Sequence, residues 1–295
     1  MARTEQTTLA RPAVLAETTE RVKKPFSWGT VGVYAGLIFG AVIVLYPFFY
    51  LLMNSVKPGP EILNSPNSLP TEITFSGYTG AFERLNMLEL FRNSILLASS
   101  ITIINTLLSA LAAYAIAKIP FPGANKLFAF MLVTMMIPGI LFLIPTYVMM
   151  YRLGWVPSFQ ALIVPSAVTV YNIFLLRQFI TGIPNELIEA FRLDGASEPQ
   201  IFLRLIIPVS RPSLAAVAIL NFMGSWNDFM GPLLYLNRPN MWTVQLGLYQ
   251  FQSSVPGQYE QEKWAAMALV TVPLVIVYFF LQDQFVKAFA NTSLK

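Results

Sequence analysis

A cluster of polar side chains interrupts a long apolar segment in the C-terminal half of the chain. Trp226, Asn227 and Asp228 follow one another, and Asn221 precedes them by one to two helical turns. An aromatic ring can stack on the apolar face of a sugar, and amides and carboxylates can bind its hydroxyls. A charge in hydrocarbon costs at least ~2.5 kcal/mol unless it faces water or a partner. We therefore expect Asp228 to face the interior of a helix bundle.

Several kinds of chemistry are excluded by composition. The sequence contains neither cysteine nor histidine, so disulfides, thiolate metal sites and the commonest general base are absent. There is no G-x-x-x-x-G-K-[ST] phosphate loop and no cluster of carboxylates. Basic residues flank apolar runs instead of forming a stripe with exposed aromatics, which argues against nucleic-acid binding. We expect no catalytic residue, no metal and no cofactor in this chain.

The elements that position the polar cluster are predicted to be membrane spans. The chain is 55% hydrophobic and 12% charged, and this charged share is about half that of a soluble domain. Uncharged runs of membrane length predict an all-α membrane protein with six transmembrane helices. Prolines and a glycine inside the third run predict a kink there. We expect a flexible cytoplasmic tail (1–28) and one transmembrane domain (29–295), with spans at about 31–53, 91–117, 127–150, 159–180, 213–236 and 264–286 and a helical loop at 181–211.

The segment between the fourth and fifth spans reads as a helix, a turn and a second helix. The first helix is expected over 185–194, and Gly195 supplies the permissive backbone at which it ends. Ser197 and Gln200 match the capping box of a second helix. Pro208 then interrupts the helical pattern before the next apolar run. The sequence thus predicts a short helix-turn-helix outside the membrane.

The distribution of basic residues predicts the orientation. With the N-terminus inside, thirteen of the nineteen Lys and Arg residues fall in segments assigned to the inner side. This excess follows the positive-inside rule. Both termini and the helical loop are therefore expected in the cytoplasm of a multi-pass protein of the cytoplasmic membrane.

The helical loop carries a recognisable pattern. The run from Glu189 to Gly195, followed by Ile207-Pro208, resembles the cytoplasmic EAA motif of permease subunits of ABC importers. Counted from Glu189, Gly195 is seventh and Pro208 twentieth, as in that family. Phe191 stands where the family has the third-place alanine, and Ile207 where it has leucine. The wider string 183–212 is most similar to the sugar-importer branch that includes the maltose permeases.

This resemblance implies that the loop couples the spans to a separate ATPase subunit. Glu189 either pairs with a basic residue of that partner or caps the turn internally. Asp194 either joins the contact or only ends its helix. The residues that match the coupling motif are Glu189, Ala190, Phe191, Asp194, Gly195, Ala196 and Pro208.

The resemblance also suggests where substrate and binding protein make contact. The substrate-pathway candidates are the polar run already described, although a structural polar cluster remains the alternative. In the maltose permeases the partner permease makes most of the sugar contacts. In the second external loop, Gly257, Gln258 and Tyr259 match the place that reaches toward an extracytoplasmic sugar-binding protein, and an inert connector is the alternative there.

Together these features predict one of two permease subunits of an ATP-driven sugar importer that works by alternating access. The expected partners are a second permease, ATP-binding ABC subunits, the sugar-binding protein, the sugar and the lipid membrane. The chain itself is not expected to be an enzyme, because the ATPase activity belongs to a partner. The alternative is an ion-coupled secondary transporter, which usually shows repeated halves and paired intramembrane acids. The sequence shows one clear intramembrane acid and no convincing repeat.

Overall fold

The computed structural model describes residues 28–252, 254–255 and 257–290. The tail predicted over 1–28 lies outside this part of the chain, except for Trp28, at which α1 begins. Within the described residues there are helices and connecting segments and no β-strand, which confirms the all-α prediction. The α-helices are α1 (Trp28–Ser55), α2 (Gly59–Asn64), α3 (Ser76–Leu85), α4 (Met87–Lys118), α5 (Ala124–Thr134), α6 (Leu143–Arg152), α7 (Gln160–Ile163), α8 (Val170–Thr181), α9 (Asn185–Leu193), α10 (Glu198–Ile201), α11 (Ile207–Val209), α12 (Arg211–Trp226), α13 (Met230–Tyr235), α14 (Val244–Gln252) and α15 (Glu260–Ala290), and shorter segments are η1 (Gly139–Phe142, 3-10), η2 (Phe202–Ile206, π) and η3 (Pro239–Met241, 3-10).

The chain divides into two units at Pro47, inside α1. In the first unit, residues 28–47 form one continuous helix without a charged side chain. The segment Gly29–Ser55 of α1 is long and apolar enough to cross a membrane. The first predicted span, about 31–53, lies within this segment, and its limits stay a prediction.

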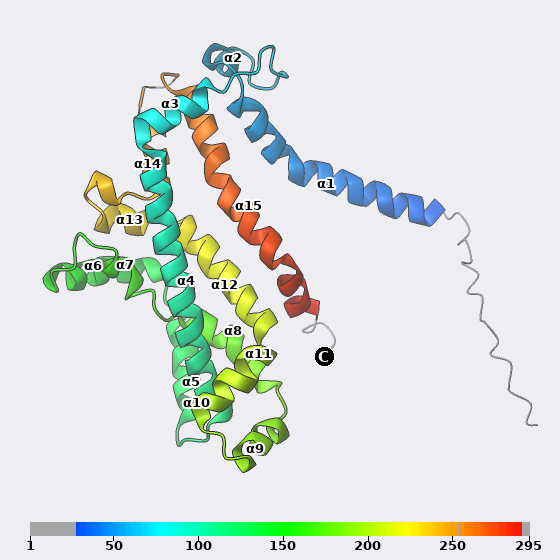
Figure 1. The fold of residues 1–295 in the computed structure, drawn as a ribbon, viewed down its shortest axis with the longest axis vertical. Helices are drawn as coiled ribbons and strands as arrows, with labels where there is room; N and C mark the ends of the chain where they lie inside the picture. The colour runs from blue at the N-terminus through cyan, green and yellow to red at the C-terminus, as the bar shows by residue number, and fades with distance from the viewer. Residues whose placement is uncertain (1–27, 253, 256, 291–295) are drawn as a thin grey trace, which may run out of the picture. The chain divides into compact units, whose positions relative to one another are not determined.

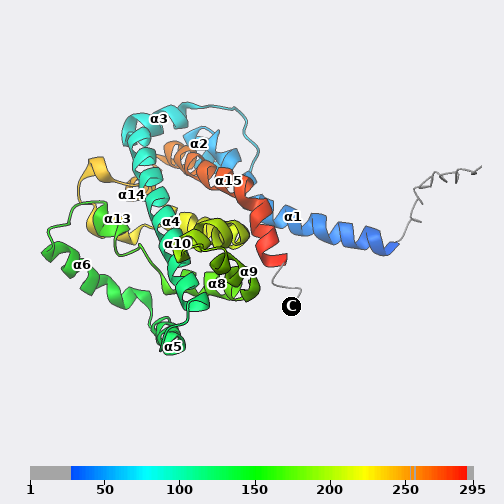
Figure 2. The same ribbon diagram turned by 60° about the horizontal axis from the view of Figure 1, so that its bottom comes forward.

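In the second unit, α4 is the helix around which the others pack. It is 32 residues long and makes its most extensive contacts with α8 and α12, while α15 packs against α12 and α3. Figure 1 shows α9 and α10 near the C-terminal end of α4, whereas α3 lies at its N-terminal end; the turned view of Figure 2 shows α8 and α12 beside α4. The helical loop therefore lies at one end of the bundle.

Proline positions explain why the third predicted span is not a straight helix. Besides α1, helices α4 and α15 are long and apolar enough to cross a membrane without interruption, and two further bent pairs pass the same test together. In the first pair, α5 and the continuous segment Gly139–Arg152 meet at 91°. Pro138 lies at the bend in extended conformation (φ −57°, ψ 126°). Because it offers no amide and its ring obstructs a continuing helix, α5 cannot run on through it. The predicted kink is confirmed, and it is a sharp bend.

The fourth and fifth predicted spans are also interrupted. Helix α7 ends at Ile163 and α8 begins at Val170, with Pro165 in the gap. Helix α12 ends at Trp226, and three residues separate it from the start of α13. A continuous helix there would place the ring of Pro232 against the carbonyl of Asp228, four residues earlier. The exact limits of six crossings stay predictions.

Apolar side chains on the outer faces of the helices fit a membrane environment. Ile103 on α4 is 59% exposed, Phe130 on α5 67% and Phe279 on α15 63%. Exposed apolar faces of this extent are uncommon on soluble monomers. Since helices satisfy their own backbone hydrogen bonds, such faces can lie in lipid.

Candidate coupling loop and substrate pathway

Helix α9 ends in a turn that depends on Gly195. The Ala196 amide donates to the Phe191 carbonyl at 2.9 Å, and the Gly195 amide donates to the Arg192 carbonyl at 3.0 Å. This pair of bonds is a Schellman motif, which requires a left-handed residue after the helix. Gly195 has φ +79°. The helix therefore ends where the sequence predicts, and it ends there because glycine adopts the left-handed conformation. Asp194 occupies the C-cap position.

The second helix begins as the sequence predicts and then bends. Gln200 Oε1 accepts a 2.8 Å hydrogen bond from the Ser197 amide, which is half of the expected capping box. The helical path continues through η2, a π-helical turn, to α11, which contains Pro208. A proline obstructs the carbonyl four residues before it, here that of Arg204 inside η2. The segment Glu198–Val209 meets α12 at 81°, so the loop joins the fifth predicted span through a sharp bend.

Apolar side chains attach the loop to the helix bundle. Ile188 of α9 is 2% exposed, and Ile201 of α10 is fully buried. Both lie in one buried cluster with Leu176 and Ile180 of α8, and Phe191 packs against its edge. The loop shares a core with the ends of α4 and α8, so a displacement of α9 must move those helices or break this packing.

A carboxylate clamp links both loop helices to α4. Glu198 accepts a hydrogen bond from the Tyr114 hydroxyl of α4 at 2.5 Å and one from Arg192 Nε of α9 at 2.8 Å. The bond from Tyr114, followed by that from Arg192, lowers the pKa of the Glu198 carboxyl below its ordinary value. Sequence reasoning missed this clamp. The pairing of Arg192 with Glu198 across a six-residue turn was a possible signal, but nothing in the sequence places Tyr114 beside them.

A lysine makes a second polar attachment. Lys118, the last residue of α4, donates to the carbonyls of Thr181 and Ile183 at 3.2 and 2.5 Å and to Asn185 Oδ1 at 2.8 Å. It therefore joins three elements: the C-terminus of α8, the connecting backbone and the first residue of α9. A cation here also suits the partial negative charge at a helix C-terminus. This attachment too was missed from the sequence.

The outer face of α9 has no partner among the residues that the structure describes. The side chains of Glu189 and Asp194 are exposed and make no hydrogen bond or ion pair with any described residue. Ala190 and Pro208 are exposed as well, and Leu193 is 90% exposed. A pocket of about 620 Å³ lies between α9 and the turn after α4, lined in part by Glu189. Of the predicted coupling residues, Phe191 and Ala196 are half-buried toward the bundle and the others face outward.

The predicted pathway residues occupy different environments. Trp226 is 1% exposed, its Nε1 donates to the Val270 carbonyl at 3.2 Å, and its ring stacks on Phe222. Asn227 is exposed and accepts from Gln245 Nε2 at 3.4 Å. Asp228 is half-buried.

The Asp228 carboxylate and the Asn221 amide each bind within the chain. Asp228 Oδ1 accepts from the Gly231 amide at 3.2 Å, in the first turn of α13. Asn221 belongs to a buried amide cluster, because it accepts from Asn172 at 2.8 Å and donates to Asn105 at 3.2 Å. The structure therefore separates four residues that the sequence treated as one group.

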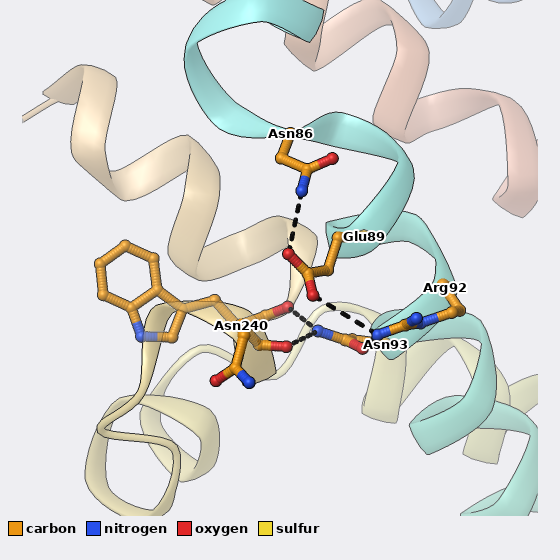
Figure 3. Close-up of polar contacts among 6 residues, drawn as sticks. Asn86, Glu89, Arg92, Asn93 and Asn240 are labelled. Atoms are coloured by element: carbon orange, nitrogen blue, oxygen red, sulfur yellow. Dashed lines mark hydrogen bonds and ion pairs between the residues drawn. The ribbon is translucent and has the colours of Figure 1, made fainter.

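At the other end of the bundle, the three residues predicted to contact a binding protein have different surroundings. Gln258 is exposed, whereas Tyr259 is half-buried with the Arg84 guanidinium 4.2 Å from its ring centroid. Gly257 has φ +85°. Figure 3 shows a further polar group at this end, which the sequence did not indicate: buried Asn93 donates at 3.0 Å to the carbonyls of Asn240 and Trp242. These bonds hold the segment before α14 against α4.

The model of the family described as "Binding-protein-dependent transport system inner membrane component" matches residues 105–291. The chain belongs to this family. It is a permease component of the ABC importer type, as the EAA-like pattern of the loop predicted. Family membership supports this class of transporter over an ion-coupled secondary transporter.

Individual relatives agree with this assignment. The permease component is 32% identical over 255 residues to the arabinooligosaccharides transport system permease protein of Halalkalibacterium halodurans, with 85% of this chain and 91% of that one covered. It is 32% identical over 252 residues to the diacetylchitobiose uptake system permease protein of Streptomyces coelicolor, with 84% and 83% covered. Its fold is similar to a chain in the crystal structure of a bacterial ABC transporter involved in import of the acidic polysaccharide alginate, with a TM-score of 0.78, 23% identity, and 88% and 99% covered.

Proposed function

We propose that this permease component is one of two membrane-spanning subunits of an ATP-driven sugar importer, and that α9 transmits movement from a separate ATPase subunit. One observation carries the proposal: α9 is attached to α4 and α8 on one face, whereas Glu189, Asp194 and Leu193 on the other face are exposed and have no partner in the described part of the chain. A helix that packs against the spans on one face and is exposed on the other can contact the ATPase and pass its movement to the spans.

The cargo and orientation are part of this proposal. Relatives named for arabinooligosaccharide and diacetylchitobiose transport favour an oligosaccharide as cargo. The excess of basic residues in the segments assigned to the inner side supports a cytoplasmic location for α9 and both termini. A sugar-binding protein then delivers the cargo at the opposite end, where Gly257, Gln258 and Tyr259 are the proposed contacts.

The proposed pathway residues have distinct roles. Asn227 and Asp228 lie in the interruption between α12 and α13. Polar groups there that make no helical hydrogen bond can bind a solute. Asn221 and Trp226 support that interruption, since they bind within the helix bundle.

Co-purification from the native membrane tests the proposal. A tagged chain should retain a second permease and an ATP-hydrolysing subunit, and the tagged chain alone should not hydrolyse ATP. Glu189→Lys should release the ATPase, because it reverses an exposed charge that lines the pocket beside α9 and has no partner among the described residues. Glu72→Lys, at an exposed position away from α9, is the matched control and should retain the ATPase. Full retention of the ATPase by the Glu189→Lys variant would contradict the proposed role of α9. ATP hydrolysis by the isolated chain would contradict the proposal that a separate subunit hydrolyses ATP.

A further inference from the structure

A small pocket lies between α14, α15 and Phe229, the residue that precedes α13, away from the coupling loop. It measures about 260 Å³ and is lined by Phe229, Gln245, Leu248, Tyr249, Lys263 and Met267. Helix α14 is held to the N-terminal part of α4, because the Val244 amide donates to Ser94 Oγ at 2.8 Å. Figure 1 accordingly shows α14 near the end of α4 that carries α3, whereas α9 lies at the other end. The pocket is thus on the side from which cargo enters in the proposed importer.

One wall of the pocket is aromatic and accessible. The rings of Phe229 and Tyr249 have centroids 5.0 Å apart and are tilted by 47°. Tyr249 is 47% exposed, so part of its ring is free for another planar or ring-shaped group. Trp226, by contrast, is 1% exposed and its ring stacks on Phe222. Tyr249 therefore offers the stacking surface that the sequence assigned to Trp226.

The polar groups of the pocket suit hydroxyls better than anions. Gln245 donates one hydrogen bond to Asn227 at 3.4 Å, and its Oε1 makes no hydrogen bond with the described residues, so an acceptor is available. Lys263 is the one charged side chain in the lining, and its amine is paired with Glu260 at 2.7 Å. Because this pair cancels the positive charge, nothing in the lining favours a carboxylate or phosphate.

We propose that this pocket receives one uncharged sugar unit of the cargo, with Tyr249 stacking on the sugar ring and Gln245 binding a hydroxyl. The inference rests on the proposed importer function and deepens it. Sites for drug-sized ligands usually measure ~300–1,000 Å³. A pocket of 260 Å³ therefore fits a single sugar unit and leaves the remainder of an oligosaccharide outside it.

Uptake by vesicles that contain the whole complex tests the proposal. The probes are radiolabelled arabinotriose and diacetylchitobiose, which are uncharged, and digalacturonate, which is acidic. Tyr249→Leu and Gln245→Leu should each raise the half-saturating concentration of the imported uncharged sugar. For the ring the expected rise is about 2–13-fold, because an aromatic contact contributes ~0.5–1.5 kcal/mol beyond burial. Tyr249→Phe keeps the ring and should restore most of the affinity. Tyr278→Leu, at a tyrosine that is 50% exposed on α15 outside the pocket, is the matched control.

Each outcome decides the proposal. A specific loss in the two pocket variants with rescue by Tyr249→Phe supports it. Unchanged uptake in both pocket variants overturns it, and so does an equal loss in Tyr278→Leu. Release of the second permease by the pocket variants would show that the pocket is a subunit interface, and a pocket-dependent preference for digalacturonate would show that it binds anions; either result overturns the assignment. Failure of the wild-type chain to retain an ATPase would instead contradict the proposed function, so the two failures are distinguishable.

Discussion

The side-chain amide of Asn105 donates a 2.7 Å hydrogen bond to the backbone carbonyl of Ser166, across the gap in which α7 has ended and α8 has not begun. The same amide accepts hydrogen bonds through Oδ1 from Asn172 at 2.7 Å and Asn221 at 3.2 Å. A broken helix inside a membrane is tolerated only where its released backbone groups find partners. Asn105 is therefore the centre of a cluster that joins α4, α8 and α12.

Asn105→Leu should lower the stability of the assembled subunit by about 1–3 kcal/mol, because it leaves buried partners unsatisfied. The measurement is the detergent or thermal denaturation of the purified complex. Ile103→Ala, at a position of α4 that is 59% exposed, is the control and should change stability far less. Equal stability of Asn105→Leu and the wild-type complex would show that water or another group replaces the amide.

The Glu198 clamp should transmit movement between α9 and α4. Glu198→Gln removes the charge that binds Arg192 and weakens the acceptor for Tyr114. We expect the complex to assemble, with sugar uptake falling further than ATP hydrolysis, because the coupling helix can move without its spans. Tyr114→Phe should reproduce part of this uncoupling, and a double variant should add little to the larger single effect. Strictly additive losses in the double variant would show that the two side chains act independently.

The pH dependence of the clamp follows from the lowered pKa of Glu198. A carboxyl whose folded pKa lies below its unfolded value contributes stability that is present above the unfolded pKa, about 4.3. This contribution is lost only as pH falls through the lowered folded pKa. The coupling between Tyr114→Phe and Glu198→Gln in denaturation experiments should therefore be the same at pH 6 and pH 8. A coupling that weakens steadily from pH 8 to pH 6 would mean that Glu198 is not the ionised acceptor.

Gly195→Val should distort the turn after α9. Gly195 has φ +79°, a conformation that costs an ordinary residue roughly 1–2 kcal/mol and a β-branched residue more. No heavy atom lies within 4 Å of the position a Cβ would take, so the penalty comes from the backbone and not from crowding. We expect reduced ATPase retention while the spans stay inserted. Gly195→Asn, which tolerates the left-handed region better, should be milder, and equal effects of both variants would point to a steric cause instead.

Asp228→Asn tests the interruption between α12 and α13. The carboxylate accepts from the Gly231 amide at 3.2 Å, and asparagine can keep that bond through its carbonyl oxygen. If the charge meets the cargo, uptake should fall while the yield of assembled complex is unchanged. A fall in yield would instead show that Asp228 stabilises α13. Normal uptake with normal yield would contradict both roles.

The local signals in the sequence determined the class of the protein and the design of its loop. Apolar runs of membrane length predicted the spans, since a backbone in lipid must satisfy its own hydrogen bonds. Gly195 and the Ser197–Gln200 capping pair predicted where one short helix ends and the next begins, because cap geometry depends on residues adjacent in the chain. The spacing from Glu189 to Pro208 gave the family resemblance.

Contacts between distant segments were decided only by the tertiary structure. Tyr114 and Glu198 are 84 residues apart, and Asn105 and Ser166 are 61 apart, so no periodic pattern could join them. Trp226 and Asp228 are close in sequence, yet α12 ends between them and their side chains have different surroundings. Tyr249 faces a pocket because α15 packs beside α14 and the ring of Phe229 lies against that of Tyr249, and this packing is a property of the assembled bundle. Burial and hydrogen bonding between helices depend on the complete fold, whereas the propensities of a segment depend only on its neighbours in the chain.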